Sequence, residues 1–404
     1  MITYLFAGGG TGGHLYPGLA IAEQIRKLAR TPVKTLFICS DRPLDREILE
    51  QAGVEFVISE ARPLSLRLSA GLRFIRAWRK SVRRCRELIA DHQRSNDRAG
   101  EGAGTVVLVA MGGFVAAPAA KAASDRQAPI VLVNLDAVPG KANRWIARRA
   151  CSVYSSARPR PDGGLPESTV VVPPIVRTQA SAGLAVESSS IGRAECRRRL
   201  GLDPDAPTLM VTGGSQGARS INEFAVRFAL SDAGQHALRI DPRAAGKPAW
   251  QIIHQTGREA DSSVAEAYRR AGIEAVVRPF AEGMGDWWGA ADLALARAGA
   301  GNVAEVWANR VPTVFMPYPH HTDDHQRYNA LPIEQAGGCR IVRDLIDPDR
   351  NLETVGPVLR SLLESSKLRK QMWAALEKLG PADGASRVAE ALIELATPAA
   401  GYAR

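Results

Sequence analysis

The sequence of 404 residues is poor in cysteine and contains no Cys-x-x-Cys pair. Its five cysteines are scattered, and none has a histidine at a spacing typical of zinc ligands. The cysteine pattern indicates neither a zinc site nor a disulfide framework, so we expect a reducing, cytoplasmic compartment. Long apolar runs are also missing, since no window approaches about 18 uninterrupted apolar residues. We therefore expect no transmembrane helix, and any membrane contact should be peripheral.

The N-terminus lacks the features of a signal peptide. Met1 leads directly into apolar residues 2–7 and then into glycines, without a basic region or a cleavage site. This pattern predicts a buried strand. Aromatic residues make up only 6% of the chain, and no nucleic-acid-binding module is recognisable, so the net charge of +10 favours an anionic membrane surface or a phosphate-bearing substrate over nucleic acid.

Short apolar runs alternate with longer helical patterns, which is typical of βαβ units around a parallel sheet. The length favours two domains. A paired proline at 173–174 and a Ser/Ala/Gly-rich stretch at 181–190 predict the linker between two series of strands, while 93–105 and 241–248 predict surface loops. The predicted strands are 2–7, 33–39, 106–109 and 130–133 in the first series, and 208–212, 251–255, 275–278, 293–296 and 313–316 in the second. Helices are predicted at 16–29 and 385–395, and the latter could return to the first domain.

Three glycine-rich loops follow predicted strands and precede predicted helices, at 8–14, 213–218 and 298–302. At such helix N-termini the main-chain amides are unpaired and the helix dipole favours an anion, so each loop can approach a phosphate. Glycines can also merely form tight turns. The first loop satisfies the GxGxxG pattern, but Asp41 comes later than a nicotinamide-binding acid should, and none of the loops has the Gly-Lys-Ser/Thr ending of a P-loop.

Four motifs, in this order along nearly the whole chain, together resemble the peptidoglycan N-acetylglucosaminyltransferases of glycosyltransferase family 28. They are Gly-Gly-Thr-Gly-Gly-His at 9–14 with Pro17, Gly-Gly-Ser-Gln-Gly-Ala at 213–218, Arg297-Ala-Gly-Ala-Gly with Glu305, and Asp324-His325-Gln326 with Asn329-Ala330.

The resemblance implies the α/β GT-B fold, in which two Rossmann-like, doubly wound parallel-sheet domains face a cleft. The acceptor and membrane-facing domain would comprise 1–176 together with a C-terminal helix at about 384–404, and the UDP-sugar donor domain would comprise 177–383. The enzyme would be an inverting hexosyltransferase without a cofactor or an obligatory metal ion. It would transfer GlcNAc from UDP-GlcNAc to the C4 hydroxyl of MurNAc in undecaprenyl-diphosphate-linked MurNAc-pentapeptide (lipid I), giving lipid II at the cytoplasmic face of the bacterial inner membrane.

The resemblance also assigns the donor site. Glu305 would accept hydrogen bonds from the ribose, Ser215 and Gln216 would lie beside the diphosphate, His325 and Gln326 would contact GlcNAc, and Arg177 would lie near uracil. The remaining donor-binding positions would be Thr11, Gly12, Gly13, His14, Ala300 and Asn329. Each has an alternative interpretation, because Glu305 could be a solvated helix carboxylate, His325 and Gln326 could cap a helix, and Arg177 could be a charge of the linker.

His14 ends the first glycine loop, where an imidazole could take the proton of the acceptor hydroxyl. It could also be a packed core histidine. The family 28 transferases that this chain resembles commonly have His-Glu-Gln-Asn where this chain has Val-Asn-Leu-Asp at 133–136. Asp136 is therefore a second candidate for the base, or a residue that holds the turn, and this difference bears on the choice of acceptor. The predicted acceptor-binding residues are Gly10, Thr11, His14, Gly112 and Gly113.

The stretch 66–86 combines aliphatic and aromatic residues with arginine and lysine and contains no acid. A basic amphipathic helix of this kind suits the headgroup region of an anionic leaflet, although its apolar stripe could instead pack within the first domain. The predicted membrane-contacting residues are Leu72, Phe74, Ile75, Trp78, Arg79 and Lys80.

Two other functions fit parts of the pattern. A related GT-B enzyme could use a different lipid acceptor such as diacylglycerol, and a UDP-sugar-binding protein could have lost turnover. The presence of His14, Glu305 and Gln326 favours a working transferase. A UDP-GlcNAc 2-epimerase shares the fold, but its glycine loops fit less well, and a nicotinamide dehydrogenase would require NAD binding.

Overall fold

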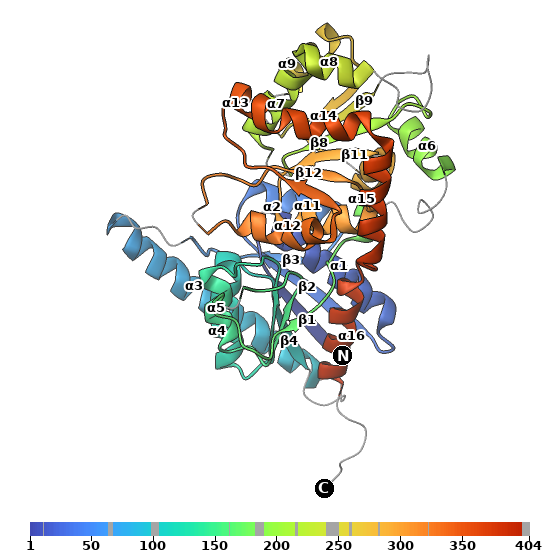
Figure 1. The fold of residues 1–404 in the computed structure, drawn as a ribbon. Coiled ribbons are helices and arrows are strands. Elements are labelled where there is room, and N and C mark those ends of the chain that lie inside the picture. Colours follow the sequence, from blue (N-terminus) through green and yellow to red (C-terminus); the bar gives the residue numbers. More distant parts are fainter. Residues whose placement is uncertain are drawn as a thin grey trace. The chain divides into compact units, whose positions relative to one another are not determined.

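The structure is a computed structural model of the chain. It describes residues 1–10, 12–63, 68–97, 105–160, 162–181, 190–214, 217–239, 250–257, 261–281, 283–321 and 323–397. The chain divides into two compact units, the first formed by Met1–Arg177 with Asp383–Arg404 and the second by Thr178–Ala382. Each unit is described by itself (Figure 1).

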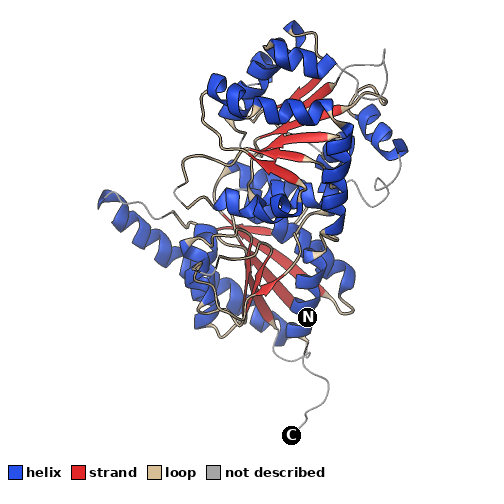
Figure 2. Ribbon diagram, viewed as in Figure 1, coloured by secondary structure: helices blue, strands red, loops and turns tan. Residues whose placement is uncertain are grey.

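The first unit contains a parallel sheet in the order β3-β2-β1-β4-β5-β6-β7. Strands β1, β4 and β5 are almost entirely apolar and buried on both faces, as is typical of parallel strands covered by helices on either side (Figure 2). The strands are β1 (Ile2–Ala7), β2 (Val33–Cys39), β3 (Phe56–Ile58), β4 (Val106–Ala110), β5 (Ile130–Asn134), β6 (Ser152–Ser155) and β7 (Val170–Val171).

The helices of the first unit cover this sheet, and the last helix of the chain returns to it. The hydroxyl of Tyr4 in β1 donates to the carbonyl oxygen of Leu392 in α16 at 3.2 Å. The carbonyl of Pro173 lies so close to Gly384 that a Cβ there would be 1.9 Å from it, so the start of α16 requires glycine. The helices are α1 (Gly12–Leu28), α2 (Pro43–Gln51), α3 (Leu68–Asp97), α4 (Gly113–Asp125), α5 (Lys141–Ala147) and α16 (Gly384–Ala396).

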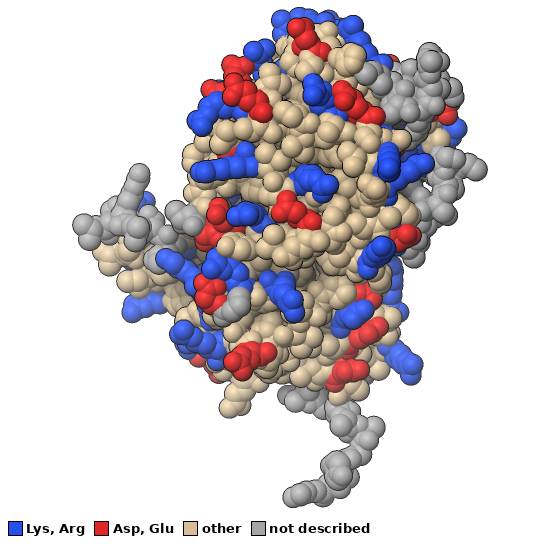
Figure 3. Space-filling model, in the orientation of Figure 1, with Lys and Arg blue, Asp and Glu red and all other residues tan. Residues whose placement is uncertain are grey.

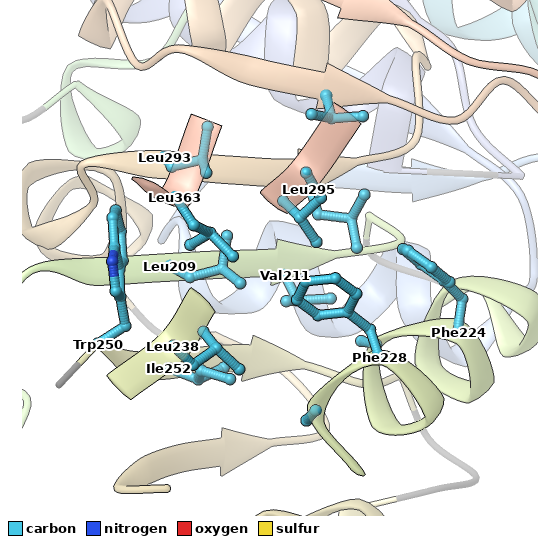
Figure 4. Packing of buried hydrophobic residues seen from close by; sticks show 14 of the residues in the cluster. Leu209, Val211, Phe224, Phe228, Leu238, Trp250, Ile252, Leu293, Leu295 and Leu363 are labelled. Carbon is cyan, nitrogen blue, oxygen red and sulfur yellow. The ribbon is translucent and has the colours of Figure 1, made fainter. Parts of the chain in front are cut away.

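The second unit contains a parallel sheet in the order β10-β9-β8-β11-β12-β13. Its core packs the apolar strands against Phe224 and Phe228 of α7 and against the buried Trp250, which immediately precedes β9 (Figure 4). The strands are β8 (Thr208–Thr212), β9 (Gln251–Gln255), β10 (Ala275–Arg278), β11 (Leu293–Ala296), β12 (Thr313–Phe315) and β13 (Cys339–Ile341).

Local signals explain several helix ends in the second unit. Asp347 caps α13 by accepting from the amides of Asp349 and Arg350 at 3.0 and 2.9 Å, and Ser365 caps α15. Gly337 ends α12 in the left-handed conformation. The helical elements are the 3-10 turn η1 (Thr178–Ala180), α6 (Ser190–Arg199), α7 (Arg219–Leu230), α8 (Asp232–Arg239), α9 (Asp261–Arg270), α10 (Met284–Ala290), α11 (Ala300–Asn309), α12 (His325–Ala336), α13 (Pro348–Thr354), α14 (Gly356–Glu364) and α15 (Ser366–Lys378).

Each sheet has one switch point, where the chain reverses the direction in which it adds strands. In the first unit it lies between β1 and β4, and in the second between β8 and β11. Ligands of open α/β sheets bind at the carboxyl ends of the strands beside such a point. The glycine loops after β1, β8 and β11 begin at these positions.

The two-sheet architecture and the strand positions agree with the sequence-based prediction. The first helix begins at Gly12, earlier than the predicted residue 16, because the glycine loop itself supplies the first turn. None of the described helices is long and apolar enough to cross a membrane. On the face in Figure 3, basic and acidic side chains are interspersed on each unit.

Candidate functional site

The first glycine loop leaves the carboxyl end of β1 and runs directly into α1. Gly10 has a φ of 87°, a conformation that side chains rarely adopt. Gly8 packs so tightly that a Cβ there would lie 2.9 Å from the Cβ of Met111. The loop therefore requires glycine for its conformation and for close packing. Thr11 lies outside the described residues.

A buried carboxylate, which the sequence analysis did not single out, holds this loop. Asp45 Oδ2 accepts hydrogen bonds from the Gly10 amide at 2.7 Å and from the Ser40 amide and hydroxyl at 3.1 and 2.6 Å. The guanidinium of Arg42 donates to the Gly10 carbonyl. Asp45 thus fixes the loop from the side of β2 and α2. The sequence offered one signal for this role, because Asp45 is an acid in the first turn of a helix that begins at Pro43.

His14 lies in the first turn of α1, next to the turn that follows β4. Gly112 and Gly113 in this turn have φ values of 100° and 77°. A Cβ on Gly112 would lie 3.3 Å from Cδ2 of His14, and a Cβ on Gly113 would lie 3.3 Å from its Cε1. Both glycines therefore make room for the imidazole, and three of the predicted acceptor-binding residues come together at the switch point. Gly12 is buried at the start of α1 and Gly13 is exposed.

The surroundings of His14 favour a neutral imidazole. Burial lowers the pKa of His14, whereas the carboxylate of Asp136, a hydrogen bond to the main chain of Gly9 and the charge of Asp45 act in the opposite direction. A neutral imidazole can accept a proton, and the nearby carboxylates stabilise the imidazolium that results. The two residues proposed for proton transfer, His14 and Asp136, thus interact electrostatically within the first unit.

Asp136 lies in a turn after β5 that is held by amide side chains. Asn134 Nδ2 donates to the Asp136 carbonyl at 2.7 Å and to Ser155 Oγ at 2.9 Å. Asn143 Nδ2 in turn donates to Asn134 Oδ1 at 3.0 Å. This network fixes the main chain that carries Asp136, which is itself partly buried.

The second glycine loop repeats this arrangement after β8. Gly214 and Gly217 have φ values of 81° and 73°. A Cβ on Gly213 would lie 2.2 Å from the Ala218 amide nitrogen, and a Cβ on Gly217 would lie 2.4 Å from the Thr256 carbonyl oxygen. The loop thus brings main chain against main chain at the start of α7. Ser215 and Gln216 lie outside the described residues.

The third loop, after β11, is fixed by a buried ion pair. Arg297 lies 2.7 Å from Asp344 Oδ2, and both side chains are almost fully buried. Ser220 Oγ donates to Asp344 at 2.6 Å and accepts from Arg297 at 2.7 Å, and Arg297 also donates to the Met316 carbonyl. This network joins the loops after β11 and β12 to the start of α7. The sequence motif contained Arg297, but its partners were not predictable because Asp344 is distant in sequence.

Glu305 lies on α11, in the turn that follows this loop. Its Oε2 accepts a hydrogen bond from Trp288 Nε1 at 2.7 Å. Burial raises the pKa of Glu305 to about 7, against the opposing effect of the Trp288 bond. The carboxyl group is therefore not a freely solvated helix charge. Ala300, at the first position of the same helix, is partly buried.

The predicted sugar-binding residues lie at the start of α12. Gln326 Oε1 accepts from the Tyr318 amide at 2.9 Å, and buried Asn329 donates to the Ala298 carbonyl at 3.4 Å. Asn329 thereby links α12 to the third glycine loop. His325 Nδ1 lies 2.8 Å from Asp323 Oδ1. Within the described part of the chain, His321, Asp323 and His325 form a group that could hold a metal ion.

Arg177 belongs to the first unit, where its guanidinium is engaged with α1. Its Nε and Nη2 donate to Glu23 Oε1 at 3.1 and 2.9 Å, and its Cζ lies 6.0 Å from the ring centroid of Tyr16. This ion pair is largely buried. Arg177 is thus not a solvated linker charge, and its role near uracil stays a prediction.

Helix α3 has one apolar side against the first unit and exposed apolar residues near its start. Leu72 is 71% exposed and Ile75 is 46% exposed. Phe74 and Trp78 are partly buried, with ring centroids 6.1 Å apart, and Trp78 meets the edge of Trp145 at 5.9 Å. The later part of the helix packs into the core through Val82, Cys85 and Ile89. The later part of α3 therefore packs within the first unit. Membrane contact by its exposed start stays a prediction.

The basic residues of this helix lie at the surface. Arg79 and Lys80 are exposed, and Lys80 forms an ion pair with Glu60 at 2.5 Å. The exposed apolar pair Leu72 and Ile75 is therefore followed along α3 by exposed positive charge. In Figure 1, α3 extends outward from the first unit.

Family comparisons match both units. The model of the glycosyltransferase family 28 N-terminal domain matches residues 4–155, and that of the C-terminal domain matches residues 208–388. The chain belongs to glycosyltransferase family 28. The matched ranges of the two family 28 domains contain both switch points and all three glycine loops.

Curated members of family 28 match nearly the full length of the chain. A UDP-N-acetylglucosamine–N-acetylmuramyl-(pentapeptide) pyrophosphoryl-undecaprenol N-acetylglucosamine transferase of Clavibacter michiganensis subsp. michiganensis (strain NCPPB 382) is 35% identical, covering 96% of this chain and 95% of the relative. The enzyme of the same name from Nocardioides sp. (strain ATCC BAA-499 / JS614) is 33% identical, covering 97% of each. Among solved structures, Acinetobacter baumannii MurG aligns with a TM-score of 0.65 at 22% identity, covering 98% of this chain and 100% of that chain, which supports the fold.

Proposed function

We propose that this protein transfers GlcNAc from UDP-GlcNAc to undecaprenyl-diphosphate-linked MurNAc-pentapeptide, forming lipid II for peptidoglycan synthesis. The near-full-length relatives from Clavibacter and Nocardioides carry the corresponding transferase name. The structural observation that carries the proposal is the position of the glycine loops, which stand at the switch point of each sheet.

The second unit supplies the donor site in this proposal. Helices α7 and α11 begin at glycine loops, so their N-terminal amides and dipoles favour the diphosphate of UDP. Glu305 accepts hydrogen bonds from the ribose hydroxyls, and Trp288 orients the carboxyl group of Glu305. Ser215, Gln216 and Ala300 line the diphosphate and ribose, while His325, Gln326 and Asn329 contact or position the sugar. Arg177 and residues 11–14 complete the donor contacts.

The first unit supplies the acceptor and the base. Neutral His14 takes the proton from the C4 hydroxyl of MurNAc as that oxygen attacks the anomeric carbon of GlcNAc. The bond from sugar to diphosphate breaks at the same time, which inverts the anomeric configuration and leaves negative charge on UDP. Main-chain amides at the helix N-termini stabilise this charge. Asp136 stabilises the imidazolium of His14, or acts as the base in its place, and Gly10, Thr11, Gly112 and Gly113 contact the acceptor.

The exposed start of α3 meets the membrane in this proposal. Leu72, Ile75 and the partly buried Phe74 and Trp78 would enter the headgroup boundary, and Arg79 and Lys80 would attract anionic lipid. The enzyme would then reach its lipid-linked acceptor from the cytoplasmic face as a peripheral protein. This position follows from the acceptor, whose polyprenyl chain stays within the bilayer.

The decisive experiment incubates the full-length protein with labelled UDP-GlcNAc and with either lipid I or diacylglycerol. We expect a labelled disaccharide product on the undecaprenyl carrier and none on diacylglycerol. Transfer to diacylglycerol alone would make the protein a related enzyme with another acceptor. UDP-GlcNAc binding without transfer to either lipid would instead support a UDP-sugar-binding protein without turnover.

A further inference from the structure

The loop between β12 and α12 brings two imidazoles and a carboxylate together. His321 Nδ1 lies 3.0 Å from His325 Nδ1, and His325 Nδ1 lies 2.8 Å from Asp323 Oδ1. One ligand atom from each residue falls within 4.8 Å of the others. His321 and Asp323 are exposed and His325 is partly buried, so the group is accessible from solvent.

Local contacts hold these side chains in place. Asp324 has a φ of 50°, and this left-handed residue immediately precedes α12. Asp323 Oδ1 also accepts from the His325 amide at 3.3 Å, which fixes the carboxylate against the helix start. The ring of His321 packs edge to face with Tyr318, with centroids 4.8 Å apart and planes at 89°. The three side chains are therefore held close together by contacts of the loop and the helix start, in addition to the contacts among their ligand atoms.

The spacing of the nitrogen atoms suits a transition-metal ion. Bonds of about 2.1 Å to imidazole nitrogen place adjacent ligands about 3.0 Å apart at right angles, and about 3.4 Å apart in a tetrahedron. The observed separation of 3.0 Å between the two Nδ1 atoms lies in this range. Without an ion, two facing Nδ1 atoms can be bridged by only one proton between them. An ion would bond to both nitrogens at once.

We propose that His321, Asp323 and His325 form a binding site for a divalent first-row transition metal such as zinc, cobalt or nickel. Two imidazoles and one carboxylate select these ions over magnesium and calcium, which prefer oxygen ligands. Three protein ligands leave further coordination positions for water or a small ligand. The site goes beyond the proposed transfer reaction, and its occupancy does not depend on that reaction.

The test uses the full chain, freed of any affinity-tag histidines, in buffer with excess magnesium. Zinc binding is measured by calorimetry, and the visible absorption of added cobalt reports the ligand environment. His321→Ala and Asp323→Asn remove one ligand each from exposed positions, so little effect on folding is expected, and thermal unfolding checks this. His320→Ala is the matched control, because His320 is exposed in the same loop but lies outside the cluster.

We expect one zinc site in the wild type that His321→Ala and Asp323→Asn each weaken by at least about tenfold, since even outer-shell partners of metal ligands are worth about 10- to 100-fold. His320→Ala should bind zinc like the wild type. The proposal is overturned if the wild type shows no saturable zinc binding, or if both ligand variants keep the affinity and cobalt spectrum of the wild type.

Discussion

The indole Nε1 of Trp288 donates a hydrogen bond to Oε2 of Glu305 at 2.7 Å. This bond joins α10 to α11 and directs the carboxyl group that we propose for ribose binding. Because burial raises the pKa of Glu305 to about 7, the group changes charge within the physiological range. Glu305 is mostly protonated below that pH and mostly ionised above it.

We expect UDP to bind more tightly as the pH rises from about 6 to 8, because only the ionised carboxylate accepts from both ribose hydroxyls. Hydrogen bonds to a charged group contribute about 1.5–3 kcal/mol, so Glu305→Gln should weaken UDP binding by about 10- to 100-fold at pH 8. Calorimetry across this range tests the expectation.

Ionisation of the UDP phosphate also affects binding in this pH range. Glu305→Gln serves as the control, because the substitution leaves the ionisation of UDP unchanged. Its pH dependence should be shallower than that of the wild type, and an equal dependence would contradict the assignment. Trp288→Phe removes the N–H donor while keeping an aromatic ring. Because the Trp288 bond lowers the pKa of Glu305, this variant should move the midpoint of UDP binding to higher pH.

His14→Ala should reduce kcat by about 100- to 10,000-fold, the range found for a positioned general base. UDP affinity should change much less, because most of the proposed donor contacts lie in the second unit. The measurement is lipid II formation with saturating UDP-GlcNAc, together with UDP binding by the same variant. Transfer at a rate near that of the wild type would remove His14 from the mechanism.

Asp136→Asn distinguishes the two roles proposed for Asp136. Because its carboxylate raises the pKa of His14, the amide should lower that pKa further and move the acidic limb of the kcat/KM profile to lower pH. If His14 is the base, the rate above this limb should fall only modestly, because the imidazolium loses one stabilising charge. A loss of about 100-fold or more at every pH would make Asp136 the base, and an unaltered profile and rate would exclude both roles.

The buried Arg297–Asp344 pair should dominate the stability of the glycine loops in the second unit. Asp344→Ala leaves the guanidinium buried without its partner, which costs about 3–5 kcal/mol in the free energy of unfolding. Asp349→Ala is the control, since it breaks the more exposed Arg227–Asp349 pair and should cost less than about 1 kcal/mol. Denaturant unfolding followed in the second unit measures both. Equal losses would show that Arg297 is well solvated without Asp344.

Replacing Leu72 and Ile75 together by aspartate should weaken binding to anionic liposomes, because apolar area is lost and charge repels the headgroups. Leu395→Asp is the matched control, since Leu395 is 41% exposed on α16 of the same unit. Cosedimentation with vesicles of varied anionic-lipid content gives the measurement. An equal effect of Leu395→Asp, or binding indifferent to anionic lipid, would count against the proposed membrane surface.

Zinc should inhibit transfer by competing with UDP-GlcNAc, because the metal would bind His325, the residue proposed to contact the sugar. This expectation rests on both the metal site and the proposed donor site. His321→Ala should relieve the inhibition, whereas His320→Ala should not. Zinc binding without inhibition would keep the metal site and move His325 away from the donor sugar.

The sequence by itself predicted the two parallel sheets well, because apolar strands such as β4 and β5 stand out against polar turns. The glycine motifs identified the loops, since glycine readily adopts the positive φ of Gly10 and only glycine permits the close contact at Gly213. The family followed from the order of these motifs along the chain. Such signals are local in sequence, so no tertiary information was needed to find them.

Only the tertiary structure decided which distant residues support these loops. Asp45 beneath Gly10, Asp344 beside Arg297 and Trp288 against Glu305 come from other elements of the chain, and no spacing in the sequence relates them. The pKa of Glu305 and the exposure of Leu72 also depend on what folds around them. Main-chain conformation depends largely on neighbouring residues in the sequence. Burial and electrostatic environment arise only when separate elements pack together.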